Sequence, residues 1–280
     1  MVPTRDRAAA LAACLGALAG QTVEDVEVVV VDDGSVDAEA VAAVVGRHPG
    51  VRLVRGEGRG PAAARNLGAR SATGDLICFT DDDCRPGPGW VAALRRRAEG
   101  GAEAVVGPTR NGRPRSPVAA ASQTVTNHLT ASTLDRRAGT VGFGPTSNVA
   151  VRADVHARVP FDEDYPLAAG EDRDWCARLA AAGVALAWEP DAGVDHHQDL
   201  TLRTFWRQQS RYGRGAHRFH GGRGRQPARF YADLLRSGFA TGPRAGVLVI
   251  VAQVATAWGL AAEAAASRNR RSDPTASRRI

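Results

Sequence analysis

Three consecutive carboxylates, Asp81 to Asp83, come shortly after the apolar run "LICF" in the segment "FTDDDCRP". Like charges this close repel one another, so the end of a buried strand is an unfavourable place for them unless a cation is present. Asp81 and Asp83 can point the same way in an extended turn, while Asp82 points elsewhere. Paired carboxylate oxygens suit Mg²⁺ or Mn²⁺, which share their remaining positions with substrate phosphates. The residues alone fit either a diphosphate-binding metal site or a solvated acidic turn.

A second acidic pair, Glu171 and Asp172, opens a predicted helix over residues 170–183. Acids in the first turn of a helix are favoured by the helix dipole without any catalytic role. That effect is enough to explain these two residues from the sequence alone.

Alternating strands and helices surround the first acidic cluster through residue 107. Continuous β-branched or apolar runs predict strands, and segments with apolar residues near 3.6-residue spacing predict helices. Such alternation predicts an α/β fold with a mostly parallel, doubly wound sheet, whose ligands bind at the carboxyl ends of the strands. Both "VDDGS" and "TDDD" lie at such ends. The predicted strands are 26–32, 51–55, 75–81 and 102–107, and the predicted helices are 6–19, 37–47, 60–72 and 88–100.

The start of the chain leaves little room for the strand that normally opens such a sheet. Only Met1 to Thr4 come before the segment that leads into the first predicted helix. We therefore expect this strand to be truncated or a stub, and we expect the native product to start upstream of Met1.

Six segments occur in a fixed order: "VPTRDR", "VEVVVVDDGSVD", "GPAAARNLGA", "GDLICFTDDDCRP", "GEDRDW" and "VDHH". Together they resemble the family 2 glycosyltransferases over roughly residues 2–215. The resemblance implies a GT-A fold and a metal-dependent, inverting transfer of a sugar from a nucleotide diphosphate sugar. The implied cofactor is Mn²⁺ or Mg²⁺. Two alternatives stay open: a non-catalytic nucleotide-sugar-binding relative, and a nucleotidyltransferase, which would need a Gly-rich basic loop that "PTRDR" lacks.

The resemblance also assigns roles to single residues. Asp172 matches the catalytic base, with Glu171 as its neighbour, and Asp81, Asp83 and His196 match the metal ligands. Arg65 is expected either to neutralise phosphate or to pair with carboxylates, and Asp32 either to bind the base or ribose or to form an Asx turn with Gly34 and Ser35. The implied substrate-binding residues are Pro3, Thr4, Asp32, Arg65, Asn66, Asp81, Ser147, Asn148, Gln208, Arg211 and Tyr212. Gln208, Gln209, Arg211 and Tyr212 resemble the Q-x-x-R-W signature of processive synthases, with Tyr in place of Trp.

The organisation of the chain follows from these assignments. We expect residues 1–107 to bind the nucleotide sugar, residues 108–220 to form the acceptor side, and residues 221–280 to form an apolar helix with an Arg-rich tail. Residues 245–262 carry no charge and are flanked by arginine. This pattern is long enough to span a bilayer, and it also fits a helix at a membrane surface or packed on the protein.

Composition narrows the location and the partners. The formal net charge of +6 is concentrated in two Arg-rich segments, so the rest of the chain is not basic enough to indicate a nucleic-acid-binding protein. The four cysteines form no C-x-x-C motif and are expected to be reduced. We therefore expect a cytoplasmic protein at the inner face of the cell membrane, whose acceptor is a cell-envelope glycan or a lipid-linked molecule.

Overall fold

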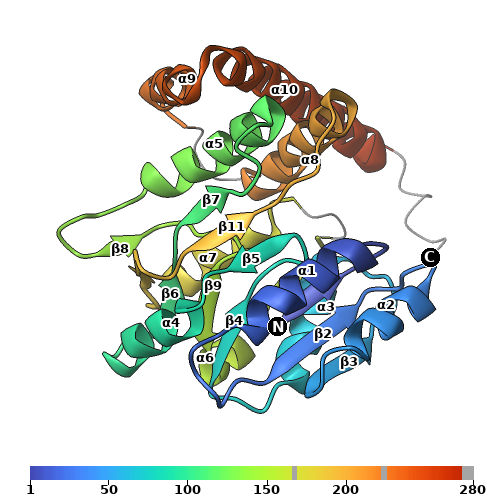
Figure 1. The fold of residues 1–280 in the computed structure, drawn as a ribbon. Coiled ribbons are helices and arrows are strands. Elements are labelled where there is room, and N and C mark those ends of the chain that lie inside the picture. The colour runs from blue at the N-terminus through green and yellow to red at the C-terminus, as the bar shows by residue number, and fades with distance from the viewer. Residues whose placement is uncertain (166–168, 222–225, 273–280) are drawn as a thin grey trace.

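The computed structural model describes residues 1–165, 169–221 and 226–272, with side chains through residue 268 (Figure 1). Helices cover a set of short strands, and a group of helices from the second half of the chain lies over one end of the strands. The strands are β1 (Val2–Thr4), β2 (Val28–Asp32), β3 (Val51–Arg55), β4 (Leu76–Phe79), β5 (Cys84–Pro86), β6 (Ala104–Val106), β7 (Thr109–Asn111), β8 (Thr140–Val141), β9 (Val149–Arg152), β10 (Leu186–Trp188) and β11 (Val194–His196). The helices are α1 (Ala8–Ala19), α2 (Ala38–Val45), α3 (Pro61–Ser71), α4 (Trp90–Glu99), α5 (Pro117–Ala131), α6 (Ala153–Arg158), α7 (Glu171–Ala181), α8 (Leu202–Phe219), α9 (Ala228–Thr241) and α10 (Pro243–Ser272).

The first strand is present, but it is short. β1 pairs in parallel with β2, with Val2 opposite Val30 and Thr4 opposite Asp32, and β2 pairs in parallel with β3. The amino group of Met1 donates a hydrogen bond to the Cys78 carbonyl oxygen at 2.8 Å, which ties this sheet to β4. The strand is therefore three residues long, which fits both expectations for this segment. A native start upstream of Met1 stays a prediction.

The central sheet is mixed rather than mostly parallel. Its order is β4-β9-β6-β10-β8, and β9 runs antiparallel to both β4 and β6. The predicted parallel arrangement therefore holds for β1 to β3 and for the pair β6 and β10. The α/β class is confirmed, and the difference arises because β9, from the segment after the Gly-rich loop, enters the middle of the sheet in the opposite direction.

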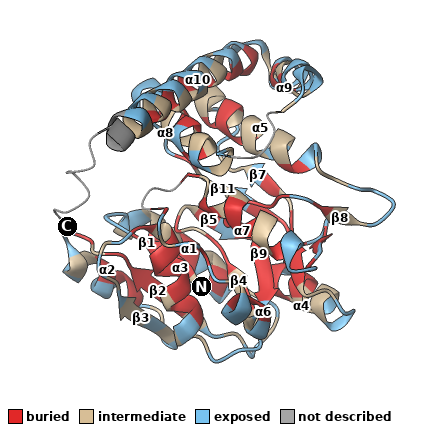
Figure 2. Ribbon diagram, turned by 180° about the vertical axis from the view of Figure 1, so that it is seen from behind, coloured by how far each residue is buried: buried red, intermediate tan, exposed pale blue. Residues whose placement is uncertain are grey.

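Apolar side chains from helices fill both faces of the sheets. Leu11 and Leu15 of α1 join Leu94 of α4 in one buried cluster, and Phe79 of β4 joins Trp175 of α7 in another. Figure 2 shows that buried residues gather on the strands and on the helices beside them. Each methylene group that is buried away from water adds about 0.8 kcal/mol to the stability of such clusters. The second cluster matters for function because it fixes the end of β4 and the start of α7, where the two acidic motifs lie.

A small third sheet sets the position of His196. β11 pairs antiparallel with β5, with His196 opposite Cys84, and in parallel with β7, with His196 opposite Asn111. This register brings the end of β11 beside the Asp81 to Asp83 turn, which precedes β5. The sequence motif "VDHH" therefore reaches the acidic cluster through backbone pairing.

Four helices, α5, α8, α9 and α10, form a layer that we call the roof (Figure 1). The backbones of α8 and α10 approach closely, since a Cβ added to Gly259 would lie 1.8 Å from the Ser210 carbonyl oxygen. A Cβ added to Gly213 would likewise lie 2.0 Å from the Thr256 carbonyl oxygen. Two glycines thus hold α10 along α8, as small residues do at tight helix crossings.

Candidate active site

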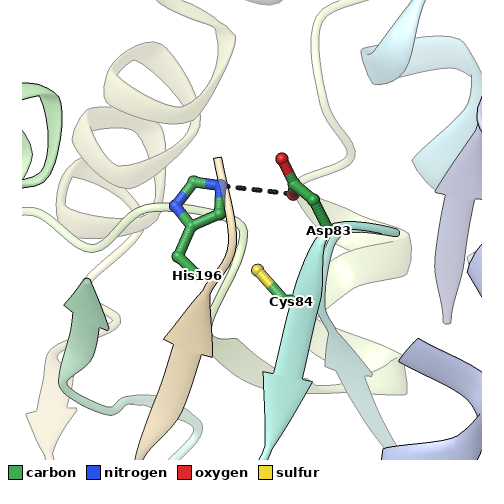
Figure 3. A group of neighbouring side chains, drawn as sticks. All are labelled: Asp83, Cys84 and His196. Atoms are coloured by element: carbon green, nitrogen blue, oxygen red, sulfur yellow. Dashed lines mark ion pairs between the residues drawn. The ribbon is translucent and has the colours of Figure 1, made fainter. Parts of the chain in front are cut away.

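The three aspartates of the acidic turn point to three different partners. Asp83 Oδ1 lies 3.2 Å from His196 Nε2, and its Oδ2 lies 2.6 Å from Nη2 of Arg7. Figure 3 shows the Asp83 carboxylate and the His196 ring facing each other from the ends of β5 and β11. Two of the three predicted metal ligands therefore lie side by side.

The charges of this pair stabilise each other. Burial raises the pKa of Asp83, but His196 and Arg7 outweigh burial and hold the pKa of Asp83 well below its usual range. Burial lowers the pKa of His196, but the Asp83 carboxylate reverses this effect and raises that pKa. An ionised carboxylate is the form that binds a hard cation.

The donor set at this position fits Mn²⁺ or Mg²⁺. Asp83, Cys84 and His196 each have one ligand atom within 4.8 Å of the others. Burial raises the pKa of the Cys84 thiol well above its ordinary value, so its sulfur stays neutral and is a poor ligand for a hard cation. The oxygen of Asp83 and the ring nitrogen of His196 remain as the suitable donors. Gln123 Oε1 lies 3.1 Å from Nδ1 of His196 and orients its ring.

Asp82 points into the protein. Its Oδ2 accepts a hydrogen bond from the Thr4 hydroxyl at 2.7 Å, and its Oδ1 lies 3.0 Å from Nη1 of Arg7. Burial raises the pKa of Asp82 to about 7. The middle acid thus joins β1 to the turn, and Arg7 bridges it to Asp83.

Arg65 connects the two acidic motifs. Its Nη2 lies 2.9 Å from Asp81 Oδ1 and its Nη1 lies 3.2 Å from Glu171 Oε1. The Arg65 side chain is 5% exposed and that of Asp81 is 27% exposed, so the pair with Glu171 is shielded from solvent and the pair with Asp81 only partly. Of the two roles considered for Arg65, pairing with carboxylates is the one observed. The predicted third metal ligand, Asp81, is bound to this guanidinium and is not part of the cluster with Asp83 and His196.

Gly170 brings the second acidic pair to the site. It has φ = 91°, and a Cβ at this position would lie 2.9 Å from the Gly215 carbonyl oxygen of α8. Glu171 and Asp172 follow in the first turn of α7. Burial, together with the charge of Asp172, raises the pKa of Glu171 to about 7 in spite of Arg65. Burial also raises the pKa of Asp172, which suits a group that must accept a proton.

A cavity of about 290 Å³ lies between the strand ends and the roof. Its lining joins residues from the acidic turn, from α7 and β11, and from all four roof helices. Of the predicted site residues, those that line it are Arg65, Asp81, Ser147, Glu171, Asp172, His196 and Tyr212.

The two predicted asparagines lie elsewhere and use their amides to hold loops. Asn66 bonds the backbone of Phe161 through both amide atoms, at 2.9 Å each. Asn148 is fully buried, and it accepts from Trp90 Nε1 at 2.8 Å and donates to the Ala192 carbonyl at 2.8 Å. Neither side chain is among the cavity-lining residues. Their substrate-binding roles stay predictions.

The remaining predicted residues also lie outside the lining of this cavity. Asp32 Oδ1 accepts from the Ser35 amide at 2.9 Å, so the Asx turn considered for it is present. Pro3 is buried in β1, and Thr4 is bonded to Asp82 as described. On α8, Gln208 accepts from the Ser122 hydroxyl at 3.0 Å, and Arg211 is half-buried.

Sequence reasoning did not single out two residues that the structure brings to the site. Arg7 pairs with two of the aspartates, and Gln123 bonds His196. Gln209, from the segment that resembles the Q-x-x-R-W signature, lines the cavity. Arg7 was visible as the last residue of "VPTRDR", next to the predicted base-binding loop. Gln123 lies in a helix whose position over the strands no motif indicates.

Comparisons with known proteins identify the family and several relatives of this chain. The family model "Glycosyl transferase family 2" matches residues 1–159. A pre-mycofactocin glycosyltransferase of Mycobacterium tuberculosis (strain CDC 1551 / Oshkosh) is 32% identical over 226 residues, which cover 77% of this chain and 46% of the relative. Glycosyltransferase AglE of Haloferax volcanii is 29% identical over 77% of this chain and 71% of its own length. The chain thus spans about half the length of the first of these relatives.

Solved structures share the fold. The mannosyltransferase PcManGT from Pyrobaculum calidifontis, in complex with GDP-Man and Mn²⁺, has a TM-score of 0.62 at 23% identity over 95% of this chain and 74% of its own. Glucosyl-3-phosphoglycerate synthase from Mycobacterium tuberculosis has a TM-score of 0.56 at 19% identity over 79% of this chain and 78% of its own. The fold is therefore that of GT-A glycosyltransferases, and the family match, which covers more than half of the chain, identifies it as a member of glycosyltransferase family 2.

Proposed function

We propose that this protein transfers a sugar from a nucleotide diphosphate sugar to an acceptor hydroxyl, with a divalent metal and with inversion at the anomeric carbon. One observation carries the proposal: a single cavity is lined by Asp81 and His196, from the acidic turn and β11, and by Asp172 from α7. A group that binds the donor and a group that can act as a base thus face the same space.

The donor side of the proposal rests on Asp83 and His196. They would hold Mn²⁺ or Mg²⁺, and Asp81 would contact the metal or the ribose once its ion pair with Arg65 rearranges. The metal would stabilise negative charge on the departing diphosphate. The fold neighbour PcManGT, which binds GDP-Man and Mn²⁺, supports this assignment by similarity.

The reaction then needs one base and one leaving group. The acceptor oxygen attacks the anomeric carbon and forms the new C–O bond, while the bond from that carbon to the diphosphate oxygen breaks. The diphosphate keeps the electron pair, and Asp172 takes the acceptor proton. Attack from the side opposite the diphosphate inverts the anomeric carbon.

The proposal includes the division of the chain. Residues 1–107 would bind the nucleotide sugar and residues 108–220 would face the acceptor. Residues 221–280 would supply α9, α10 and the Arg-rich tail; residues 222–225 and 273–280 lie outside the described part of the chain. Asp32 pairs with Arg55 and with the Ser35 amide. The proposal also includes a role for Pro3, Thr4 and Asp32 in binding the nucleotide base.

Contact with a membrane surface is also proposed. The segment Pro243–Arg268 is long and apolar enough to cross a membrane. However, α10 packs tightly on α8, and several arginines lie on the surface of α8. If α10 crossed a bilayer in this arrangement, these charged side chains would enter the membrane, which is costly. The outer face of α10 exposes Val247, Ile250, Val254 and Trp258, which suits a helix lying at the cytosolic face of a membrane. A cell-envelope glycan or a lipid-linked acceptor would be available there.

The test is transfer or hydrolysis with a panel of UDP-, GDP- and dTDP-sugars, with Mn²⁺ and with EDTA. NMR of the first product formed reports the anomeric configuration. We expect one donor class to react, only with metal, and to give the inverted product. Retention at the anomeric carbon, or equal rates in EDTA, would contradict the mechanism.

A further inference from the structure

The roof end of the cavity differs from the acidic end. Its walls carry apolar side chains from three roof helices and from the loop before β9, together with polar side chains of the roof, among them Gln209, Tyr231 and Gln253. The apolar side chains come from α5 (Val125 and Leu129), from the loop before β9 (Phe143), from α9 (Phe230 and Leu234) and from α10 (Leu260). We propose that this end is an acceptor subsite for an alcohol with an apolar body, whose hydroxyl bonds to Gln209; this inference rests on the proposed function.

Gln209 is a polar residue of α8 whose side-chain oxygen is left unsatisfied at this end of the cavity. Its side chain is fully buried, and its Oε1 has no hydrogen-bond partner among the described residues. Its amide nitrogen lies 3.5 Å from Gln208 Oε1, at the outer limit of a hydrogen bond. A buried acceptor without a partner costs about 1–3 kcal/mol. A ligand hydroxyl that donates to Oε1 removes this cost.

The position of Gln209 is fixed by the backbone around it. The Thr256 hydroxyl of α10 donates to the Gln209 carbonyl oxygen at 3.4 Å, and the close contacts of α10 with Ser210 and Gly213 follow directly along α8. Gln209 lines the same cavity as Asp172. An alcohol held there would present its oxygen within the space that the base also faces. Its single proton would leave the hydrogen bond to Gln209 Oε1 and pass to Asp172 as the oxygen attacks, so Gln209 acts as a positioning residue.

The apolar walls select the body of the acceptor. A glycan carries many hydroxyl groups, and each one pressed against Leu129 or Leu234 would lose its water without gaining a partner. An apolar group gains about 25 cal/mol for each Å² that it buries there. The cavity volume, about 290 Å³, lies near the lower end of the roughly 300–1,000 Å³ range of small-molecule pockets. One aromatic ring or a short prenyl chain fits this description, and an extended glycan does not.

Calorimetric binding of three probes tests the subsite: benzyl alcohol, farnesol and methyl glucoside. Each is titrated into the protein alone and into the protein with Mn²⁺ and the nucleoside diphosphate. We expect benzyl alcohol or farnesol to bind, and the stronger of the two distinguishes an aromatic from a prenyl acceptor. Methyl glucoside is expected to bind at least about tenfold more weakly.

Two variants and one control separate the subsite from general effects on folding. Leu129→Asn places an amide in the apolar wall and is expected to weaken the apolar alcohol at least about tenfold. Gln209→Leu is expected to weaken benzyl alcohol but not toluene, because only the alcohol uses Oε1. Leu202→Asn, at an exposed position of α8 outside the cavity, is expected to change neither. Thermal unfolding of each variant checks that it is folded.

The outcomes decide the two proposals separately. Stronger binding of methyl glucoside, no binding of either alcohol, or unchanged alcohol binding in folded Leu129→Asn would overturn the subsite and leave the proposed transfer intact. Equal weakening of toluene and benzyl alcohol in Gln209→Leu would overturn the role of Gln209. Failure of every nucleotide to bind would contradict the proposed function, while alcohol binding to the protein alone would still decide the apolar subsite.

Discussion

Asp172 is the residue on which the proposed chemistry depends most. The Asp172→Asn variant keeps the shape of the side chain but cannot accept a proton. We expect its kcat to fall by about 10² to 10⁴-fold, with nucleotide affinity unchanged. The acidic limb of the wild-type kcat/KM profile is expected above the ordinary pKa of an aspartate, because burial raises the pKa of Asp172.

Asp174→Asn is the matched control for this prediction. Asp174 lies in the same helix and pairs with Arg178 at 2.7 Å, and it does not line the cavity. Its kcat is expected to stay within about threefold of the wild type, because Asp174 does not line the cavity, and thermal unfolding checks that the buried substitution leaves the protein folded. A loss of nucleotide affinity in Asp172→Asn would instead assign Asp172 to the donor site.

Glu171 makes a prediction about stability. Burial raises its folded pKa from 4.5 to about 7, so the folded protein binds a proton that the unfolded chain releases between these pH values. This contribution to stability is fully present below about pH 4.5 and is lost as the pH rises through about 7. We expect Glu171→Gln to lack this loss. Its free energy of unfolding relative to the wild type should rise between pH 5 and pH 8 by on the order of 2 kcal/mol.

Urea unfolding at several pH values measures this difference. Glu39→Gln, at an exposed position of α2, serves as the control and should show no such trend. A Glu171→Gln curve that runs parallel to the wild-type curve at every pH would show that Glu171 is ionised throughout the range.

At the scale of the elements, the close contact between Gly170 and α8 sets the position of the second acidic motif at the start of α7. Gly170→Ala introduces a Cβ at φ = 91° and 2.9 Å from the Gly215 carbonyl oxygen, so the start of α7 must move away from α8. Gly183 at the other end of α7 has φ = 82° and nothing within 4 Å of an added Cβ. Both substitutions carry backbone strain of about 1–2 kcal/mol, and only Gly170→Ala adds the clash.

Activity separates the two glycine variants. We expect Gly170→Ala to lower kcat at least about tenfold, because it displaces Asp172, and Gly183→Ala to lower only the melting temperature. Equal kcat values in the two variants, measured well below their melting temperatures, would mean that contact with α8 does not set the position of Asp172.

The sequence predicted individual elements better than their pairing. The β-branched run that ends at Asp32 and the helix opened by Gly60-Pro61 were found where periodicity and capping signals indicated them. The direction of β9 was not predictable, since a buried strand has the same pattern in either direction. The same limit applied to the register of β11, which places His196 beside Asp83 through backbone hydrogen bonds.

The candidate site was predictable where motif residues act directly. Asp83, His196, Glu171 and Asp172 came from the resemblance. Asp83 lies beside His196, and His196, Glu171 and Asp172 line one cavity. Gln209 was not predictable as a lining residue, because the face of α8 that meets the cavity is set by its glycine contacts with α10. Sequence spacing alone pointed equally to Gln208.

At the scale of the whole molecule, the outer face of α10 predicts membrane contact. The double variant Val254→Asp, Trp258→Ser places a charge and a small polar group on this face. We expect it to reduce co-sedimentation with anionic vesicles at least about tenfold without changing the melting temperature, since both side chains are exposed. Val36→Asp, at a 93% exposed position in the loop before α2, is the control. Unchanged vesicle binding in the double variant would exclude this face.

The central claim is that Asp83 and His196 hold a metal that binds a nucleoside diphosphate in this fold. Calorimetry with UDP, GDP and dTDP, each with and without Mn²⁺, tests it in the wild type and in Asp83→Ala, with Asp154→Ala as a surface control. The account predicts that one nucleotide binds only with Mn²⁺, that Asp83→Ala abolishes this binding, and that Asp154→Ala does not affect it. Binding that is independent of Mn²⁺, or that survives in Asp83→Ala, would contradict it.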